Sequence, residues 1–215
     1  MDAIDRITPT KRPAGAPQGY QRWRSLLFLH WEVPLAVLRP LVPDALALDT
    51  CEDRAYVGLV PFTMQGVRPL RQLPALPGTA DFHETNVRTY VHHRGAPGVY
   101  FFSLDAASRL AVWAARTFFH LPYFHAAMTL TRQGDEVRYT SARRRGSADL
   151  SLRYRIGAPL PPSEPGTLQF FLAERYLLFT QDKEGQVLCG QVHHAPYPLR
   201  AAEVLALDQG LLAAA

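Results

Sequence analysis

Three polar side chains of different chemistry alternate along a short, otherwise apolar stretch, FHETNVRTYV. Glu84, Asn86 and Arg88 stand two residues apart, and alternate side chains of a β-strand project from the same face. If that face meets solvent, the stretch is an ordinary amphipathic strand. If it lines the interior of a barrel, a carboxylate, an amide and a guanidinium share a confined space, where such groups tune a proton donor or anchor a ligand.

The histidines do not converge in the way that a metal ion requires. Adjacent pairs at 92–93 and 193–194 would point to opposite faces of a strand and could not share an ion. His120 and His125 flank a proline within TFFHLPYFHA, where spacing alone decides nothing, and a zinc site is the less favoured interpretation. The chain also has no GxSxG elbow, P-loop or dinucleotide-binding glycine motif. We therefore expect no metal and no cofactor.

Composition limits the classes of partner. The net charge of +4 comes from only two lysines, Lys11 and Lys183, and otherwise from arginine, and the basic run at 142–146 lies in a strand-like stretch without a nucleic-acid motif. The longest apolar runs are far shorter than a membrane span, and the first residues have no apolar stretch of the signal-peptide type. Two cysteines are too few for a disulfide framework. We expect a cytoplasmic monomer or homodimer that binds neither nucleic acid nor membrane.

Hydrophobic periodicity indicates an α+β chain made mostly of hairpins. Residues 1–19 are expected to form a loose tail, and residues 20–215 a single domain in which helices pack outside a curved sheet or barrel. The proline-rich stretch 69–81 has the character of a lid loop. Strands are expected at 20–33, 55–68, 82–93, 99–105 and 148–157 and in hairpins that turn near 133–135 and 183–185, and helices at 34–43, 106–119 and about 164–173.

An ordered series of motifs resembles the acetoacetate decarboxylase-like superfamily. The series consists of RWRSLLFLHW, LAVLRPLVPDALALD, AYVGLVPFTM, FHETNVRTYV, VYFFSLDA and AARTFFHLPYFHA. The later motifs FLAERYLLF and VHHAPYPLR resemble its DUF2071 or YqjF-like branch. The resemblance covers residues 20–200 and implies a closed, cone-shaped antiparallel β-barrel around an apolar cavity, with a few peripheral helices.

The resemblance also assigns roles to single positions. Arg24 matches the active-site arginine of the decarboxylases, Glu84 their key glutamate, and Arg116 the arginine of the helix that precedes the catalytic lysines. The two lysine positions, which follow an aromatic-proline step, are occupied here by Tyr123 and Phe124. This departure decides what chemistry is open to the chain.

Schiff-base decarboxylation requires a neutral amine, whose pKa a neighbouring cation depresses. Tyr123 cannot form an imine and Phe124 supplies no cation, while Lys11 and Lys183 lie in the expected tail and in a polar hairpin turn. We therefore expect that the protein is not a decarboxylase of this type.

The favoured hypothesis is a cavity that binds a small, partly apolar carboxylate or carbonyl compound. Arg24 would pair with an anion, Glu84 would share a proton, and Tyr123 would donate a hydrogen bond to a carbonyl or enolate oxygen, which supports lyase, hydrolase or enolisation chemistry. The alternatives are a non-catalytic binding or sensing protein and a purely structural barrel in which Arg24 and Glu84 satisfy each other. Whether the chain is an enzyme stays open. The further candidate ligand-binding residues are Arg116, Asn86, Arg88, His120, His125, Glu174 and Tyr176.

Overall fold

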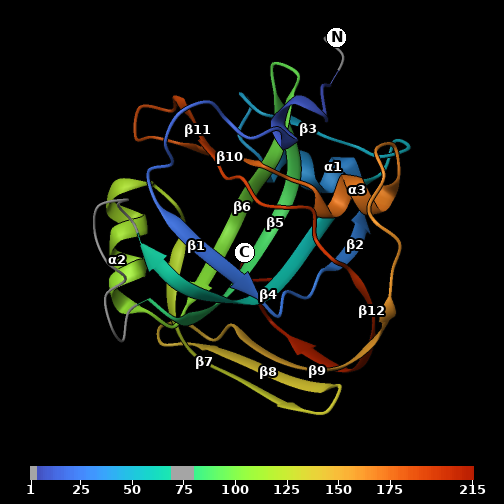
Figure 1. Ribbon diagram of the computed structural model, residues 1–215. Helices are drawn as coiled ribbons and strands as arrows, with labels where there is room; N and C mark the ends of the chain where they lie inside the picture. Colours follow the sequence, from blue (N-terminus) through green and yellow to red (C-terminus); the bar gives the residue numbers. More distant parts are fainter. Residues whose placement is uncertain (1–3, 69–79) are drawn as a thin grey trace.

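The computed structural model describes residues 4–68 and 80–215, and most of this part of the chain forms β-strands (Figure 1). The helices are α1 (Leu35–Leu38), α2 (Arg109–Phe118) and α3 (Leu168–Ala173), with 3-10 turns at Thr8–Thr10 and Arg39–Leu41. The strands are β1 (Tyr20–Arg24), β2 (Leu29–Val33), β3 (Ala47–Leu48), β4 (Ala55–Arg68), β5 (Phe82–His93), β6 (Ala96–Ala106), β7 (Tyr123–Gln133), β8 (Glu136–Arg143), β9 (Asp149–Pro159), β10 (Leu177–Gln181), β11 (Val187–Gln191) and β12 (Arg200–Gln209).

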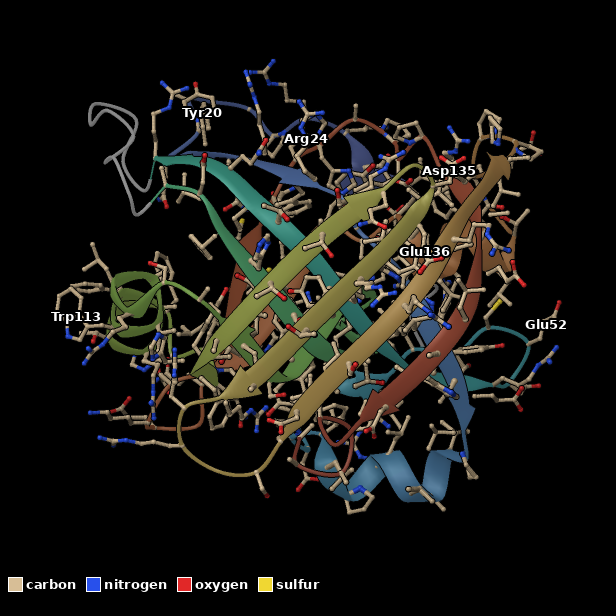
Figure 2. All side chains as sticks on the ribbon, turned by 90° about the horizontal axis from the view of Figure 1, so that it is seen from below. Tyr20, Arg24, Glu52, Trp113, Asp135 and Glu136 are labelled. Atoms are coloured by element: carbon tan, nitrogen blue, oxygen red, sulfur yellow. The ribbon has the colours of Figure 1, made fainter. Side chains whose placement is uncertain are left out.

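The strands belong to one continuous sheet in the order β1-β4-β5-β6-β7-β8-β9-β12, with β2, β3 and β10 on side branches. Only three residue pairs join the parallel strands β6 and β7, and beyond this junction β7, β8, β9 and β12 cross in front of β4 (Figure 2). Within the described residues, the end strands β1 and β12 do not pair. The α+β prediction with few helices is therefore confirmed, whereas a closed barrel is not, because hydrogen bonds do not close the sheet.

Both faces of β5 are buried, because a different layer covers each one. Val87 packs with Leu59 and Tyr139 in a core between the two halves of the sheet. On the opposite face, Phe82 packs with Val112 of α2 in a second core. The strand is thus buried along almost its whole length, and the polar residues at even positions lie in or beside the second core.

Local chemistry sets the ends of several elements. Ser108 Oγ accepts a hydrogen bond from the Ala111 N–H at 3.3 Å and caps α2, as expected of serine at a helix N-terminus. The helix expected at 34–43 is shorter, because α1 ends at Leu38 and a 3-10 turn containing Pro40 follows; proline lacks an N–H for a continued helix. The strand expected at 20–33 divides at Ser25, whose φ of 52° is left-handed.

The hairpin that joins β5 to β6 is tighter than the five residues, 94–98, that separate the strands expected at 82–93 and 99–105. Arg94 and Gly95 form it alone, with φ values of 51° and 79°, as a two-residue type I′ turn requires. Gly98 then lies inside β6, where an added Cβ would come within 2.7 Å of the Leu177 carbonyl oxygen. The absence of a side chain at Gly98 lets β10 approach β6.

Part of the expected loose tail contacts the domain. The Asp5 N–H donates to the Gly95 carbonyl at 3.1 Å, and the Arg6 guanidinium binds the Asp49 carboxylate. Of the expected lid loop at 69–81, residues 69–79 lie outside the described residues. Among the described residues, no helix combines the length and the apolar character needed to cross a bilayer.

Candidate functional site

Glu84 and Tyr123 form a buried hydrogen-bonded pair between β5 and β7. Glu84 pairs across the sheet with Ala106 of β6, and Tyr123 pairs with Leu104 of the same strand. Because Leu104 and Ala106 are two residues apart, both functional side chains project from one face. The Tyr123 hydroxyl donates to Glu84 Oε2 at 2.9 Å, and Glu84 is only 2% exposed and Tyr123 8%. The pair is therefore shielded from bulk water.

This environment keeps both groups of the pair neutral at pH 7. Burial raises the pKa of Glu84 to about 8, against a lowering effect of the Tyr123 hydrogen bond. Burial, reinforced by Glu84, also raises the pKa of Tyr123 well above its usual value. A carboxylic acid that stays protonated can donate a hydrogen bond or a proton to a ligand. Behind the pair, the Tyr139 hydroxyl donates to the Glu84 backbone carbonyl at 2.9 Å and fixes the strand from its other face.

Arg88 is a buried cation on the same face of β5. The register with β4 is regular from Phe82 to Thr89, so residues 84, 86 and 88 project together. Arg88 Nη2 donates to the Leu172 carbonyl of α3 at 3.0 Å, and the guanidinium lies 5.5 Å from the Phe28 ring centroid. Arg88 is only 9% exposed, yet among the described residues no carboxylate lies within ion-pair distance of its guanidinium. Buried charges are ordinarily paired, so this arginine has the capacity to bind an anion.

Tyr90 and His30 hold the Arg88 end of the face in place. The Tyr90 hydroxyl donates to the Leu172 carbonyl at 2.8 Å, so the His30 Nε2–H, at 2.6 Å, donates to the Tyr90 oxygen. Burial, together with the charge of Arg88, lowers the pKa of His30 to about 3 and keeps the ring neutral. Gly58 leaves room for this imidazole, since an added Cβ would lie 3.1 Å from it.

Arg24 is not brought to this site. Trp23 pairs with Met64 of β4 and shares its face with the second core, while Arg24 pairs with Thr63 and projects from the opposite face. Arg24 is exposed, on the outer strand β1 (Figure 2). Arg24 was expected to converge with Glu84 and Tyr123, and for Arg24 this expectation is wrong. The alternation of side chains along β1 turns Arg24 away from the other two residues.

The remaining candidates fall into two groups. Arg116 is exposed on α2, and His120 and His125 are half-buried at the entry to β7, with no side-chain hydrogen bond to Glu84 or Tyr123. Glu174 and Tyr176 meet at the end of α3, where the Tyr176 hydroxyl donates to Glu174 Oε2 at 2.7 Å. Among the described residues, no group of three or more His, Cys, Asp or Glu side chains could hold a metal ion.

Glu174 connects the end of α3 to residues 193–197, a segment that the sequence pattern did not place near this site. Its Oε1 accepts the Tyr197 N–H at 3.1 Å, which ties residues 193–197 to the end of α3. Tyr197 in turn lies 5.4 Å from Phe28, the ring beneath Arg88. The many aromatic and histidine residues of VHHAPYPLR were the only hint in the sequence that this segment contributes to a site. Its position beside Phe28 depends on long-range packing, which the sequence pattern does not give.

An open cavity beside Glu84 is not confirmed. A small hollow lies between the N-terminal 3-10 turn and α3, with Arg6, Pro97, Phe171, Glu174 and Tyr176 among its lining residues. Neither Glu84 nor Tyr123 contributes to it. Packed side chains enclose the pair in this structure.

The comparisons with known proteins agree with the fold. The DUF2071 family model, described as an uncharacterized conserved protein, matches residues 20–215, and the chain therefore belongs to this family. It is 45% identical over 185 residues to the uncharacterized protein YqjF of Bacillus subtilis (strain 168), which covers 85% of this chain and 75% of that protein.

Solved structures with the same architecture are acetoacetate decarboxylase-like enzymes. The decarboxylase of Legionella pneumophila subsp. pneumophila str. Philadelphia 1 matches 95% of this chain and 82% of its own with a TM-score of 0.55 and 12% identity. The enduracididine biosynthesis enzyme MppR, complexed with pyruvate, matches 91% of each chain with a TM-score of 0.55 and 9% identity. At these identities the likeness shows the fold alone, and the fold is acetoacetate decarboxylase-like.

Proposed function

We propose that the protein binds a small, partly apolar carboxylate or carbonyl compound over the even face of β5 and carries out non-covalent acid/base chemistry on it. The observation that carries this proposal is the presence, on one strand face, of a buried hydrogen-bonded acid and a buried arginine that has no carboxylate partner within residues 4–68 and 80–215. Glu84 and Arg88 are four residues, and hence about 13 Å, apart along β5, with Asn86 between them, so a small ligand meets both groups only through the reach of their side chains.

Each group has a distinct role in the proposal. Arg88 binds the anionic or carbonyl end of the ligand, because a guanidinium suits a carboxylate. Glu84, which burial keeps neutral, transfers the proton, and the hydrogen bond from Tyr123 orients that acid. The exposure of Arg24 favours Arg88 over it for the anion, although the resemblance assigned that role to Arg24.

The same site argues against a Schiff-base mechanism. Tyr123 is committed to Glu84, and the Phe124 ring packs 3.9 Å from the Arg143 guanidinium. Lys11 and Lys183 are exposed, far along the chain from β5. An enol or enolate hydrogen-bonded to Glu84 replaces an imine as the stabilised species. The pyruvate complex of MppR, a protein of the same fold, supports a small oxo acid as one class of ligand.

A non-catalytic binding or sensing protein is the second candidate. The observation in its favour is the close packing around Glu84, which leaves little room for a reacting molecule without movement of the surrounding chain. A purely structural role is the limiting case, in which Tyr123 merely satisfies Glu84. The cytoplasmic location, the monomeric or dimeric state and the absence of nucleic-acid and membrane partners remain predictions.

A ligand screen by thermal shift tests the proposal, because a ligand that binds the folded state raises the melting temperature by mass action. Oxo acids, hydroxy acids and fatty acids are compared on the wild type, Glu84→Gln and Tyr123→Phe. Small oxo or hydroxy acids are expected to stabilise the wild type. Exchange in D2O of the hydrogens on the carbon next to the ketone of an oxo acid, or next to the carboxylate of a hydroxy acid, is expected to stop in both variants. Tyr20→Phe, on the exposed edge strand, is the matched control. A protein that no compound stabilises contradicts the proposal, and binding without exchange selects the sensing role.

A further inference from the structure

A cluster of aromatic rings covers the middle of the proposed site. The His194 ring is stacked on Tyr176 at 4.4 Å and lies 4.4 Å from Tyr197. Trp23 lies 5.5 Å from His194 and 6.4 Å from Tyr197, and Tyr197 also contacts Phe28. Because Phe28 contacts Arg88, the 193–197 segment and β1 close over the even face of β5.

Four polar atoms, in this cluster and on the even face of β5 beneath it, are buried without a hydrogen-bond partner in the described part of the chain. They are Trp23 Nε1, Asn86 Oδ1, Arg88 Nε and His194 Nε2. Asn86 is 5% exposed and Arg88 9%. Buried polar atoms are nearly always paired, and leaving one unpaired costs about 1–3 kcal/mol. Four of them around one set of rings therefore indicate a site for a molecule that supplies the missing partners.

The chemical character of the four atoms specifies that molecule. Trp23 Nε1 and Arg88 Nε can only donate, and Asn86 Oδ1 can only accept. His194 Nδ1 lies 2.8 Å from the Ala195 carbonyl oxygen, which can only accept, so Nδ1 carries the hydrogen. In a neutral ring His194 Nε2 is then an acceptor as well. The ligand needs an acceptor group of two oxygens and, next to it, at least one hydroxyl donor.

We propose that Trp23, Asn86, Arg88 and His194 form the recognition site for a small 2-hydroxy acid. The carboxylate accepts hydrogen bonds from the Arg88 and Trp23 N–H groups, and the hydroxyl donates to Asn86 Oδ1 or His194 Nε2. The rings of Phe28 and Tyr197 enclose the alkyl part. This inference rests on the proposed function for the position of the ligand, and it adds the substrate class and two residues, Trp23 and His194.

The positive charge favours a carboxylate over a neutral molecule or water alone. Arg175 and Arg143, two further arginines with nearly fully buried side chains, contact Asp49 and Asp105 at 2.7 and 2.9 Å. Arg88 has only carbonyl and hydroxyl acceptors among the described residues. An anion would complete its environment in the way that an aspartate does for the other two.

The segment that covers the site is suited to admit a ligand. Residues 192–199 belong to no strand, and Ala195 and Pro196 are exposed. Its backbone makes few hydrogen bonds to the rest of the described chain, among them those from the Val192 N–H to Tyr176 and from the Tyr197 N–H to Glu174. Segments with few backbone hydrogen bonds open at low free-energy cost, so entry requires no disruption of the sheet.

The inference is tested by following the indole N–H signals of the 15N-labelled protein by NMR during titration with 2-hydroxybutanoate. Trp23→Phe assigns the Trp23 signal, and Trp113, exposed on α2, serves as the internal control (Figure 2). Butanoate lacks the hydroxyl, and 1,2-butanediol lacks the carboxylate. We expect the Trp23 signal alone to move, and the two control compounds to bind at least about tenfold more weakly, because each leaves buried groups unpaired.

Two variants separate this inference from the proposed function. Asn86→Leu and His194→Phe keep the size of the side chain, and together they are expected to weaken 2-hydroxybutanoate about tenfold while leaving butanoate within twofold. Binding that leaves Trp23 unmoved and ignores this double variant, yet is weakened by Glu84→Gln, overturns the inference and leaves the proposed function standing. Equal affinity for butanoate overturns hydroxyl recognition. If none of the screened acids binds at all, the proposed function fails together with the inference.

Discussion

Two arginines pack against the ring of Tyr90, and their surroundings differ in one respect. Arg175 lies 4.9 Å and Arg88 5.5 Å from the centroid of that ring. Arg175 also packs on Phe171 and binds the fully buried Asp49 at 2.7 Å, whereas Arg88 has no carboxylate partner among the described residues. The nearest acid on its own strand face, Glu84, is neutral at pH 7 because burial raises its pKa to about 8.

This difference in pairing assigns the two arginines different roles: Arg175 stabilises the fold, and Arg88 is available for binding. The Asp49–Arg175 pair joins α3 to the chain before β4 and, through Arg6, also fixes the N-terminal segment. Removing one member of such a pair leaves an uncompensated buried charge. On the face of β5 that carries Arg88 and Glu84, the folded protein already contains a buried charge without a counter-charge among the described residues. A protein retains such a charge where a ligand supplies the opposite one. The first region is thus expected to respond to mutation in folding, and the second in binding.

The largest expected effect is on the paired arginine. Asp49→Ala leaves Arg175 buried without a counter-charge and is expected to lower the free energy of unfolding by about 3–5 kcal/mol. Urea denaturation measures the loss, and Asp44→Ala, at an exposed aspartate nearby in the sequence, is the control. A loss no larger than that of the control would show that the pair does not hold α3.

The pH dependence of stability is an effect of similar size, spread over several pH units. The pKa of Glu84 is raised above its unfolded value of 4.5 to about 8, so its contribution is fully present below pH 4.5 and is lost as the pH rises to 8. The wild type is expected to lose stability relative to Glu84→Gln by about 1.4 kcal/mol per pH unit over that interval.

The difference between these two proteins is the quantity to measure, because His30 acts in the opposite direction. Its pKa is lowered to about 3, so its contribution is present above pH 6.5 and declines as the pH falls from there toward 3. His30 is present in both the wild type and Glu84→Gln, so its contribution cancels in the difference between their free energies of unfolding. Denaturation curves measured from pH 5 to pH 8 give that difference. Parallel stability curves would mean that Glu84 titrates normally.

A smaller effect is expected from removal of the Tyr123 hydroxyl. Tyr123→Phe deletes the hydrogen bond to Glu84 and should lower the free energy of unfolding by about 1 kcal/mol. It should also raise the pKa of Glu84, because that bond favours the ionised form. The 13C signal of the Glu84 carboxyl group, followed through a pH titration, reports the pKa directly. A lower pKa in the variant would contradict the assigned role of the hydroxyl.

Local sequence pattern was sufficient for the central elements. The apolar runs and turn residues predicted β4, β5 and α2, and the alternation of Glu84, Asn86 and Arg88 placed them on one face, since the period of a strand is two. The absence of lysine at positions 123 and 124 is read directly from the sequence, and its meaning was taken from the resemblance to the acetoacetate decarboxylase-like superfamily. These features depend on neighbours in the sequence.

The rest depends on long-range register and packing. A shift of one residue in pairing exchanges the two faces of a strand, and the pairing of Trp23 with Met64 and of Arg24 with Thr63 decides that Trp23 and not Arg24 faces inward. The pairing of β12 with β9 was likewise not predicted, nor was the path of the 193–197 segment over Phe28. Closure of the barrel depends on whether the end strands meet, and no local pattern encodes that.

The affinity for 2-hydroxybutanoate of Arg88→Met and Arg24→Met, measured by calorimetry against the wild type, tests the central claim most directly. Methionine fills the space of the buried stem without a charge, so Arg88→Met should change the free energy of unfolding by no more than about 1 kcal/mol. We predict that Arg88→Met weakens binding at least about tenfold and that Arg24→Met leaves it unchanged. Loss of binding in Arg24→Met, with full affinity in Arg88→Met, would contradict the account.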